Sequence, residues 1–179
     1  WNWDYQQFNL KGDPKAPFQN KLVRQAISYA IDREAIVKEI YNGEANITDN
    51  QIPKGYLGHR ASLLRYPKNG DLNKAKALMA QAGVKGYEVE VITSDKDWLR
   101  RELELVAAMV SQIGINYKIR NLDMGGFNNL WLNQKFEQHL EDITLVAPDP
   151  DATSWWILNS KGSSSGLNNP EMYTITDNA

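Results

Sequence analysis

The chain has 179 residues, of which 42% are hydrophobic and 23% are charged, with 20 lysines and arginines and 22 acidic residues. This size and composition suit one globular domain or one large lobe with its own hydrophobic core, and they exclude a disordered or fibrous protein. Because there is no basic excess, we expect no nucleic-acid partner.

Cysteine is absent, which excludes disulfides, thiolate metal sites and cysteine nucleophiles. The longest apolar runs, 89–93 and 143–147, fall far short of the ~20 residues that span a bilayer. The opening residues 1–5 have neither the basic head nor the apolar middle of a signal peptide. We therefore expect a chain that is mature or excised from a longer one, and its compartment stays open on composition alone.

The first third of the chain predicts a strand followed by two helices. Residues 1–10 alternate imperfectly between aromatic and polar side chains, which indicates a half-buried strand with an irregularity near Gln6 and Gln7. Apolar residues between 23 and 31 share one helical face. Asp32 can cap a second helix, and Gly43 can end it in a left-handed conformation.

The middle of the chain predicts a βαβ unit. Residues 43–70 contain prolines and glycines with no sustained period, so we expect a long surface connection. A helix capped by Asp71 and ended by Gly83 follows it. Alternation over 87–91, a helical stripe over 99–113 and renewed alternation over 115–119 then predict strand, helix and strand, with parallel pairing and a right-handed crossover.

The last part of the chain predicts one more helix and one more strand. Gly125 and Gly126 separate the preceding strand from a short amphipathic helix that carries Phe127 and Trp131, and 142–146 indicates a strand. From residue 148 onward the sequence is loop-like, with a flexible link over 160–166 and no completed helix at the end. The predicted fold class is α/β.

Residues with catalytic chemistry are isolated from one another. His59 and His139 are far apart and belong to no catalytic motif, so we interpret both as solvated surface residues. The acids Asp142, Asp149 and Asp151 are interrupted by prolines and lack the spacing of a metal loop. We therefore expect neither an enzyme nor a bound metal or cofactor.

Tryptophan is frequent, with 6 residues, and two of them adjoin a proline-aspartate turn. An indole suits a hydrophobic core, and its flat apolar face with one donor also suits the wall of a ligand cleft. For Trp155 and Trp156 together, core or lobe packing is slightly favoured, and we expect at most one of them to reach a cleft.

Residues 18–37 resemble the signature helix pair of the peptide/nickel-type (family 5) extracellular solute-binding proteins of ABC importers. Further segments in the same order are similar to other landmarks of that family: the proline-glycine loop 52–55, the helix 71–83, and the short motifs 113–115, 149–151 and 168–171. The resemblance covers nearly the whole chain.

The resemblance implies a periplasmic binding protein type II-like lobe, with a mixed sheet flanked by helices. Residues 1–179 would form a single C-terminal lobe, a fragment of a two-lobed protein whose N-terminal lobe is absent from this chain. The whole protein would capture an oligopeptide or another small solute between its lobes and deliver it to an ABC permease in the membrane. It would be periplasmic or extracellular, anchored to the membrane through a segment outside this chain.

One departure from the family concerns the ligand. The peptide binders that the sequence resembles carry a tryptophan and then an aspartate in the strand before the Asp-Pro turn, and the aspartate pairs with the amino terminus of the peptide. In this sequence Ile143 and Val146 stand at those positions. Glu141, Asp142 or Asp149 are the nearby acids that could compensate, so the sequence leaves the ligand open.

Candidate ligand contacts lie where strands end, because open α/β sheets bind ligands at the carboxyl ends of their strands. The sequence predicts two groups of contacts, one after each of two strands: Thr93, Ser94 and Asp95, and Val146, Asp149 and Trp155.

Two alternatives to a transport receptor remain at this stage. The same lobe could serve as the sensory or docking module of a regulator or a surface lipoprotein, and the missing aspartate at position 146 permits this. A hydrolase or metal enzyme has only isolated histidines and acids in its favour, although one fold can host many functions.

Overall fold

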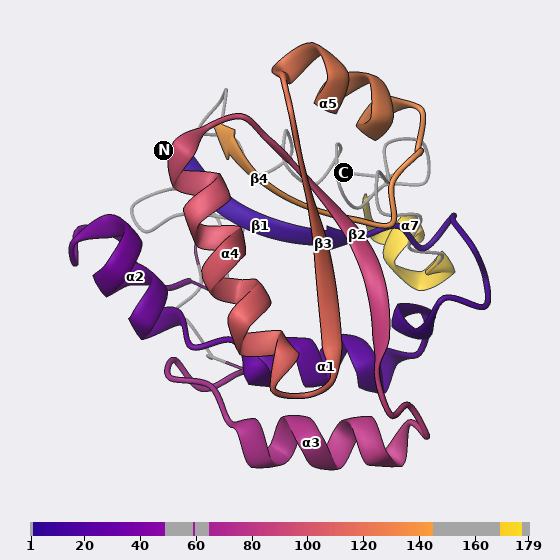
Figure 1. The fold of residues 1–179 in the computed structure, drawn as a ribbon. Coiled ribbons are helices and arrows are strands. Elements are labelled where there is room, and N and C mark those ends of the chain that lie inside the picture. Colours follow the sequence, from indigo (N-terminus) through magenta and orange to yellow (C-terminus); the bar gives the residue numbers. More distant parts are fainter. Residues whose placement is uncertain (1, 49–58, 60–64, 145–168, 177–179) are drawn as a thin grey trace.

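The computed structural model describes residues 2–48, 59, 65–144 and 169–176. A strand and several consecutive helices come first, and helices and strands then alternate from residue 72 to residue 144 (Figure 1). In chain order the elements are β1 (Asn2–Phe8), η1 (Pro17–Gln19), α1 (Lys21–Ala30), α2 (Arg33–Tyr41), α3 (Leu72–Gln81), β2 (Tyr87–Ser94), α4 (Asp97–Ser111), β3 (Ile115–Leu122), α5 (Met124–Leu132), β4 (Gln138–Thr144) and α7 (Pro170–Thr176).

The four strands form one mixed sheet in the order β1-β4-β2-β3. β2 and β3, which α4 connects along the chain, pair in parallel, and this confirms the parallel pairing of the predicted βαβ unit. β4 lies between β2, to which it is parallel, and β1, to which it is antiparallel. The carboxyl ends of β2, β3 and β4 and the amino end of β1 therefore lie along one edge of the sheet, which we call the carboxyl edge.

The helix starts follow the capping residues in the sequence. The side chains of Asp32 and Asp71 accept hydrogen bonds from the backbone N–H groups of Ala35 and Lys74, each at 2.9 Å, so both predicted caps are confirmed. α2 ends at Tyr41, and the next residue, Asn42, adopts a left-handed conformation with φ 52°. These local signals fix the helix ends because they satisfy backbone groups that have no partner inside a helix.

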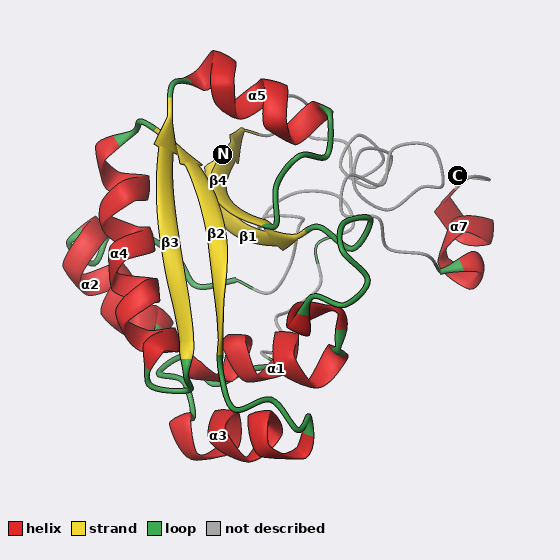
Figure 2. Ribbon diagram, turned by 45° about the vertical axis from the view of Figure 1, so that its right-hand side comes forward, coloured by secondary structure: helices red, strands yellow, loops and turns green. Residues whose placement is uncertain are grey.

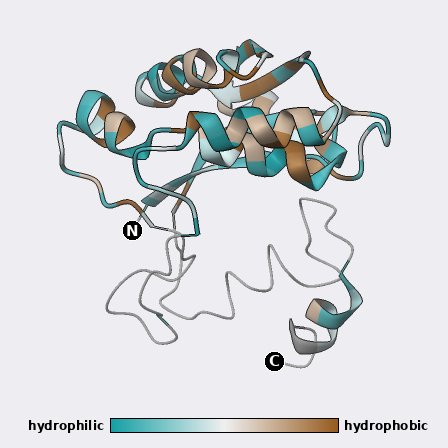
Figure 3. Cartoon of the chain, turned by 90° about the horizontal axis from the view of Figure 1, so that it is seen from below, coloured by the Kyte–Doolittle hydropathy of each residue, from teal (hydrophilic) through white to brown (hydrophobic). Residues whose placement is uncertain are grey.

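Both faces of the sheet are covered, by different helices (Figure 2). On one face, α1, α3 and α4 bury a large cluster against β2, β3 and β4, with Val91, Leu103 and Ile115 fully buried. On the other face, Ile92 packs with Phe127 of α5 and with Phe136. Brown and teal segments alternate along the same helices in Figure 3, as expected for amphipathic helices that cover a sheet.

Four details of the sequence prediction are wrong. β1 pairs with β4 in continuous register through Gln6 and Gln7, without an irregularity. The predicted strand 142–146 begins earlier, at Gln138, and residues beyond 144 lie outside the described part. Gly125 and Gly126 belong to the first turn of α5, where Asp123 caps the helix. The last residues do contain a helix, α7.

The glycine pair lies inside α5 because Asp123 needs room for its cap. Its side chain accepts a hydrogen bond from the backbone N–H of Gly126 at 2.8 Å. A Cβ atom at Gly125 would lie only 3.1 Å from the same carboxylate oxygen. The glycines therefore allow a close helix start here, where the sequence alone suggested a break. The predicted connection 43–70 is described only in part, and the predicted link 160–166 lies outside the described residues.

Candidate functional site

The predicted ligand contacts after β2 lie at the carboxyl edge. Thr93 and Ser94 are the last residues of β2 and are fully buried, whereas the following residue, Asp95, is exposed. The structure therefore gives Asp95 direct access to solvent and holds Thr93 and Ser94 within the sheet. The other three predicted contacts, at positions 146, 149 and 155, lie outside the described residues and stay predictions.

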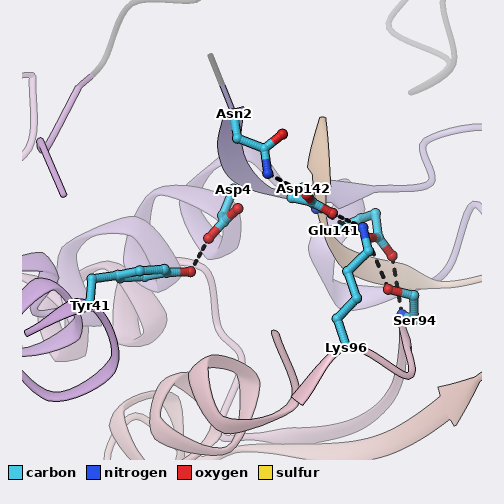
Figure 4. Close-up of polar contacts among 7 residues, drawn as sticks. All are labelled: Asn2, Asp4, Tyr41, Ser94, Lys96, Glu141 and Asp142. Carbon is cyan, nitrogen blue, oxygen red and sulfur yellow. Dashed lines mark hydrogen bonds and ion pairs between the residues drawn. The ribbon is translucent and has the colours of Figure 1, made fainter. Parts of the chain in front are cut away.

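Ser94 belongs to a polar network that joins the ends of three strands (Figure 4). The Ser94 backbone N–H and hydroxyl donate to the two carboxylate oxygens of Glu141, at 3.1 and 3.0 Å. Lys96 Nζ donates to Glu141 Oε1 at 2.9 Å and also forms an ion pair with Asp142. The Asn2 side-chain amide donates to the other oxygen of Asp142. We call these five residues the carboxyl-edge network.

Strand register explains why these side chains meet. In the parallel pairing of β2 with β4, Ile92 lies beside His139, so two residues further on Ser94 lies beside Glu141 on the same face. Asp142 is on the opposite face of β4, but Lys96 follows the end of β2 and its long side chain reaches both carboxylates. Lys96 occupies the N-cap position of α4, but its ammonium group has no acceptor atom to cap the helix and instead donates to the two carboxylates.

The network is largely shielded from water. The side chains of Glu141, Asp142 and Lys96 are 7%, 9% and 24% exposed. Burial raises the pKa of Glu141, and its hydrogen bond with Asp142 raises it further. Burial also opposes ionisation of Asp142 and Lys96, but their mutual contacts outweigh it, so the pKa of Asp142 falls and that of Lys96 rises. Lys96 thus compensates the two adjacent acids, mainly by keeping Asp142 ionised.

Two further acids, one on β1 and one on α4, lie beside the network and contact a tyrosine of α2. Tyr41 of α2 contacts both Asp4 of β1 and Glu102 of α4 through its hydroxyl, the latter at 2.7 Å. We call Asp4, Tyr41 and Glu102 the acid cluster. All three line a cavity of about 940 Å³ between β1, α1, α2 and α4. Asp4 lies directly opposite Asp142 in the β1–β4 ladder, so the cluster and the network adjoin.

Sequence reasoning named Glu141 and Asp142 as nearby acids but missed Lys96, Asn2 and the acid cluster. These groups come from segments far apart in the chain. The pairing of β4 with both β1 and β2 brings Asn2, Asp4 and Lys96 together, and the packing of α2 on α4 adds the rest of the acid cluster. The available signal was the polar sequence that follows β2, which begins with Lys96 close after the predicted strand.

The prediction that His139 is a solvated surface residue is wrong. His139 is fully buried in β4, and its ring makes edge contacts with Tyr5, Phe127 and Phe136 at centroid distances of 5.2, 5.5 and 5.0 Å. Burial lowers the pKa of His139 to about 3, so the imidazole is neutral at physiological pH. Its Nε2 lies 3.1 Å from the Gln7 side-chain oxygen. His59 is partly exposed and borders the cavity.

Within residues 2–48, 59, 65–144 and 169–176, no group of three or more histidine, cysteine, aspartate or glutamate side chains is arranged to hold a metal ion. None of the helices in these ranges is long and apolar enough to cross a membrane.

Related sequences match part of this chain. Heme-binding protein A of Haemophilus influenzae is 35% identical over 120 residues, covering 64% of this chain and 21% of its own length. The dipeptide-binding protein of Escherichia coli is 30% identical over 132 residues, covering 70% of this chain and 24% of its own length. The chain thus spans less than a quarter of the length of these two curated relatives.

Solved structures superpose on almost the whole chain. The periplasmic binding protein DppA of Helicobacter pylori, in complex with the peptide STSA, gives a TM-score of 0.87 at 22% identity, over 99% of this chain and 35% of its own. AgaA of A. tumefaciens R10, in complex with agropinic acid, gives a TM-score of 0.82 at 27% identity, over 99% and 37%. The periplasmic binding protein type II-like fold expected from the sequence is confirmed.

The family model of the bacterial extracellular solute-binding proteins, family 5, matches residues 1–165, in agreement with the motifs in the sequence and with the mixed sheet. The chain belongs to the bacterial extracellular solute-binding proteins, family 5.

Proposed function

We propose that this chain is the C-terminal lobe of a two-lobed substrate-binding component of an ABC importer. The single observation that carries the proposal is the family match over residues 1–165. The whole protein would capture an oligopeptide or another small solute between its lobes and deliver it to a membrane permease. It would do so in the periplasm or outside the cell, held at the membrane through a segment outside this chain.

The position of the polar residues supports the carboxyl edge as this lobe's share of the ligand site. Open α/β sheets bind ligands in the crevice beyond the carboxyl ends of their strands. Here that edge carries the carboxyl-edge network and exposed Asp95. A ligand drives closure of two lobes only if it makes more favourable contacts in the closed state than in the open one. One lobe alone should therefore bind weakly.

The ligand class is proposed broadly, as a peptide or another small solute. The related proteins are named for different ligands, including heme and a dipeptide, and the AgaA structure contains agropinic acid. In the network, both carboxylate oxygens of Glu141 and of Asp142 already have partners within the lobe. Position 146 carries valine where the peptide binders resembled by the sequence carry an acid. Together these observations leave no unpaired network carboxylate for a ligand ammonium group.

The proposal is tested by thermal unfolding of a protein that joins this chain to its N-terminal lobe, with a panel of peptides, sugars and metal chelates. A ligand at one hundred times its Kd stabilises the native state by about 2.7 kcal/mol, which gives a clear upward shift in Tm. The absence of a shift with every member of the panel would contradict a transport receptor.

The contacts are tested by calorimetry with the ligand found in this way. Alanine variants of the six predicted contacts, Thr93, Ser94, Asp95, Val146, Asp149 and Trp155, are expected to include several with weakened binding. Asp13→Ala is the matched control, since Asp13 is exposed in the loop beyond the opposite end of β1. Equal affinity of all six variants and the control would place the ligand elsewhere.

A further inference from the structure

In the acid cluster the Tyr41 hydroxyl contacts two carboxylate oxygens but has one proton to donate. The Tyr41 hydroxyl lies within hydrogen-bond distance of a carboxylate oxygen of Asp4 and of one of Glu102. A phenol has one proton and can donate to only one acceptor at a time. If both carboxylates were ionised, one contact would place two oxygen atoms together without a hydrogen. The geometry therefore requires a second proton on one of the carboxyl groups.

Glu102 is the carboxyl group that its surroundings favour for this proton. Glu102 is 7% exposed, and its burial is the main cause that raises its pKa to about 8, with the charge of Asp4 adding to the effect. Burial and the two neighbouring acids also raise the pKa of Tyr41, so the phenol stays protonated. At neutral pH the cluster then holds a neutral Glu102 beside Asp4.

No described cation takes the place of that proton. Asp142 lies opposite Asp4 in the ladder, Lys96 pairs with Asp142, and Arg33, Glu44 and His59 line the same cavity. Arg101 of α4 precedes Glu102 and donates to the backbone carbonyl of Glu39 in α2 at 3.4 Å. Lys96 forms its ion pairs with the network acids, and Arg33 donates to backbone carbonyls at the end of α1. Across the parts of the chain that the structure describes, no ion pair to Asp4 or Glu102 occurs. Among the described residues, ionised Glu102 would therefore face Asp4 without a compensating cation.

α2 is the element that can move when this repulsion develops. α4 is held by several fully buried residues, among them Leu99 and Leu103, and β1 is held by its ladder with β4. α2, in contrast, buries only Ile36 among its nine residues. Local opening begins in elements with few buried contacts. The C-terminal turn of α2, which carries Tyr41, also accepts a long hydrogen bond of 3.4 Å from Arg101 at the Glu39 carbonyl, but with so little buried surface α2 is held less firmly than β1 and α4.

We propose that the acid cluster is a pH-dependent contact that holds the C-terminal turn of α2 against β1 and α4 while Glu102 is protonated, and releases it when Glu102 ionises. Because α2 and the residues after it line the cavity of about 940 Å³, this release widens the cavity at alkaline pH. The inference concerns the body of the lobe and does not depend on the proposed transport function.

The test is a pH titration of the intact protein by NMR, with ¹³C-labelled glutamate carboxyl groups and ¹⁵N-labelled amides. We expect the Glu102 carboxyl signal to titrate near pH 8, and the amide signals of Tyr41 and Asn42 to shift with the same midpoint. A Glu102 carboxyl group that is already ionised below pH 6 would overturn the proposal. Titration near pH 8 without any shift in α2 would overturn it as well.

Variants separate the cluster from the rest of α4. Glu102→Gln keeps a neutral side chain that can donate a hydrogen bond, so the alkaline transition in α2 should disappear. Glu104→Gln is the matched control, because Glu104 is exposed on the same helix and should leave the transition unchanged. Asp4→Asn removes the adjacent charge and should move the midpoint to lower pH. A midpoint that does not move in Asp4→Asn would contradict the coupling of the two acids.

Discussion

Replacing Lys96 by methionine tests the carboxyl-edge network most directly. The substitution keeps a similar length and removes the ammonium group that lies 2.9 Å from Glu141 and also pairs with Asp142. Both acids have side chains less than one tenth exposed, at 7% and 9%. Removing one partner of a fully buried ion pair costs about 3–5 kcal/mol. Because Lys96 is itself 24% exposed, we expect a smaller loss of about 2–3 kcal/mol in the free energy of unfolding at pH 7.

The loss in Lys96→Met should depend on pH. Without the lysine, the folded-state pKa of Glu141, which is already raised, rises further, and that of Asp142 loses one cause of its lowering, so the native state of the variant binds protons more tightly than that of the wild type. The variant then regains stability relative to wild type as pH falls from 7 toward 4. Urea unfolding followed by circular dichroism at both pH values measures the difference.

Two further variants make the result decisive. Adding Glu141→Gln to Lys96→Met removes one of the two uncompensated charges and should restore at least half of the lost stability. Lys118→Met is the matched control, because Lys118 pairs with Glu88 on the surface of the same sheet and should change stability much less. A loss in Lys96→Met no larger than in Lys118→Met, or no recovery in the double variant, would refute the compensation of the two acids by Lys96.

Three other predictions concern burial and backbone conformation. The wild type should lose on the order of 4 kcal/mol of stability as pH falls from about 6.5 toward 3, because the unfolded chain binds a proton that buried His139 does not. A pH series of denaturant unfolding curves should lack this contribution in His139→Phe. Gly114→Ala places a Cβ atom 2.7 Å from the Lys85 carbonyl oxygen and should lower the free energy of unfolding by about 2–4 kcal/mol. Gly83→Ala, whose Cβ would have no atom within 4 Å, should lower it by about 1 kcal/mol. Equal losses in the two variants would contradict the close approach at Gly114. Leu103→Ala leaves a cavity at a fully buried position and should lower the free energy of unfolding by about 2–5 kcal/mol, while a loss below about 1 kcal/mol would contradict its burial in α4.

The helices and the βαβ unit could be predicted because their signals are local. The caps at Asp32 and Asp71 and the apolar stripe of α4 depend on residues within one or two turns of each other. The same holds for the alternation over 87–91 in β2 and over 115–119 in β3, where apolar and polar side chains take turns along the strand. Such periodicities follow from helix and strand geometry and need no knowledge of the tertiary structure.

β4 could not be predicted in the same way, because it lies in the middle of the sheet and is buried on both faces. Its sequence around His139 and Glu141 is polar, which indicates a surface segment when considered alone. The burial comes from distant residues: Tyr5 and Phe127 enclose the imidazole ring, and Ser94 with Lys96 compensates the carboxylate. Polar groups are buried in proteins when such partners exist, and those partners are set by the tertiary fold.

Acids are buried in two ways at the carboxyl edge, in the carboxyl-edge network and in the acid cluster, and the two groups should respond differently to pH. The charges of Glu141 and Asp142 are compensated by Lys96, a side chain of the same chain, whereas the contact between Asp4 and Glu102 is relieved by a proton that exchanges with solvent. The ends of β2 and β4 should therefore keep their geometry over a wide pH range, and only α2 should respond to alkaline pH. Because the network acids are satisfied within the chain, the proposed binding function places ligand specificity on side chains that follow the strand ends, such as Asp95, more than on those within the strands.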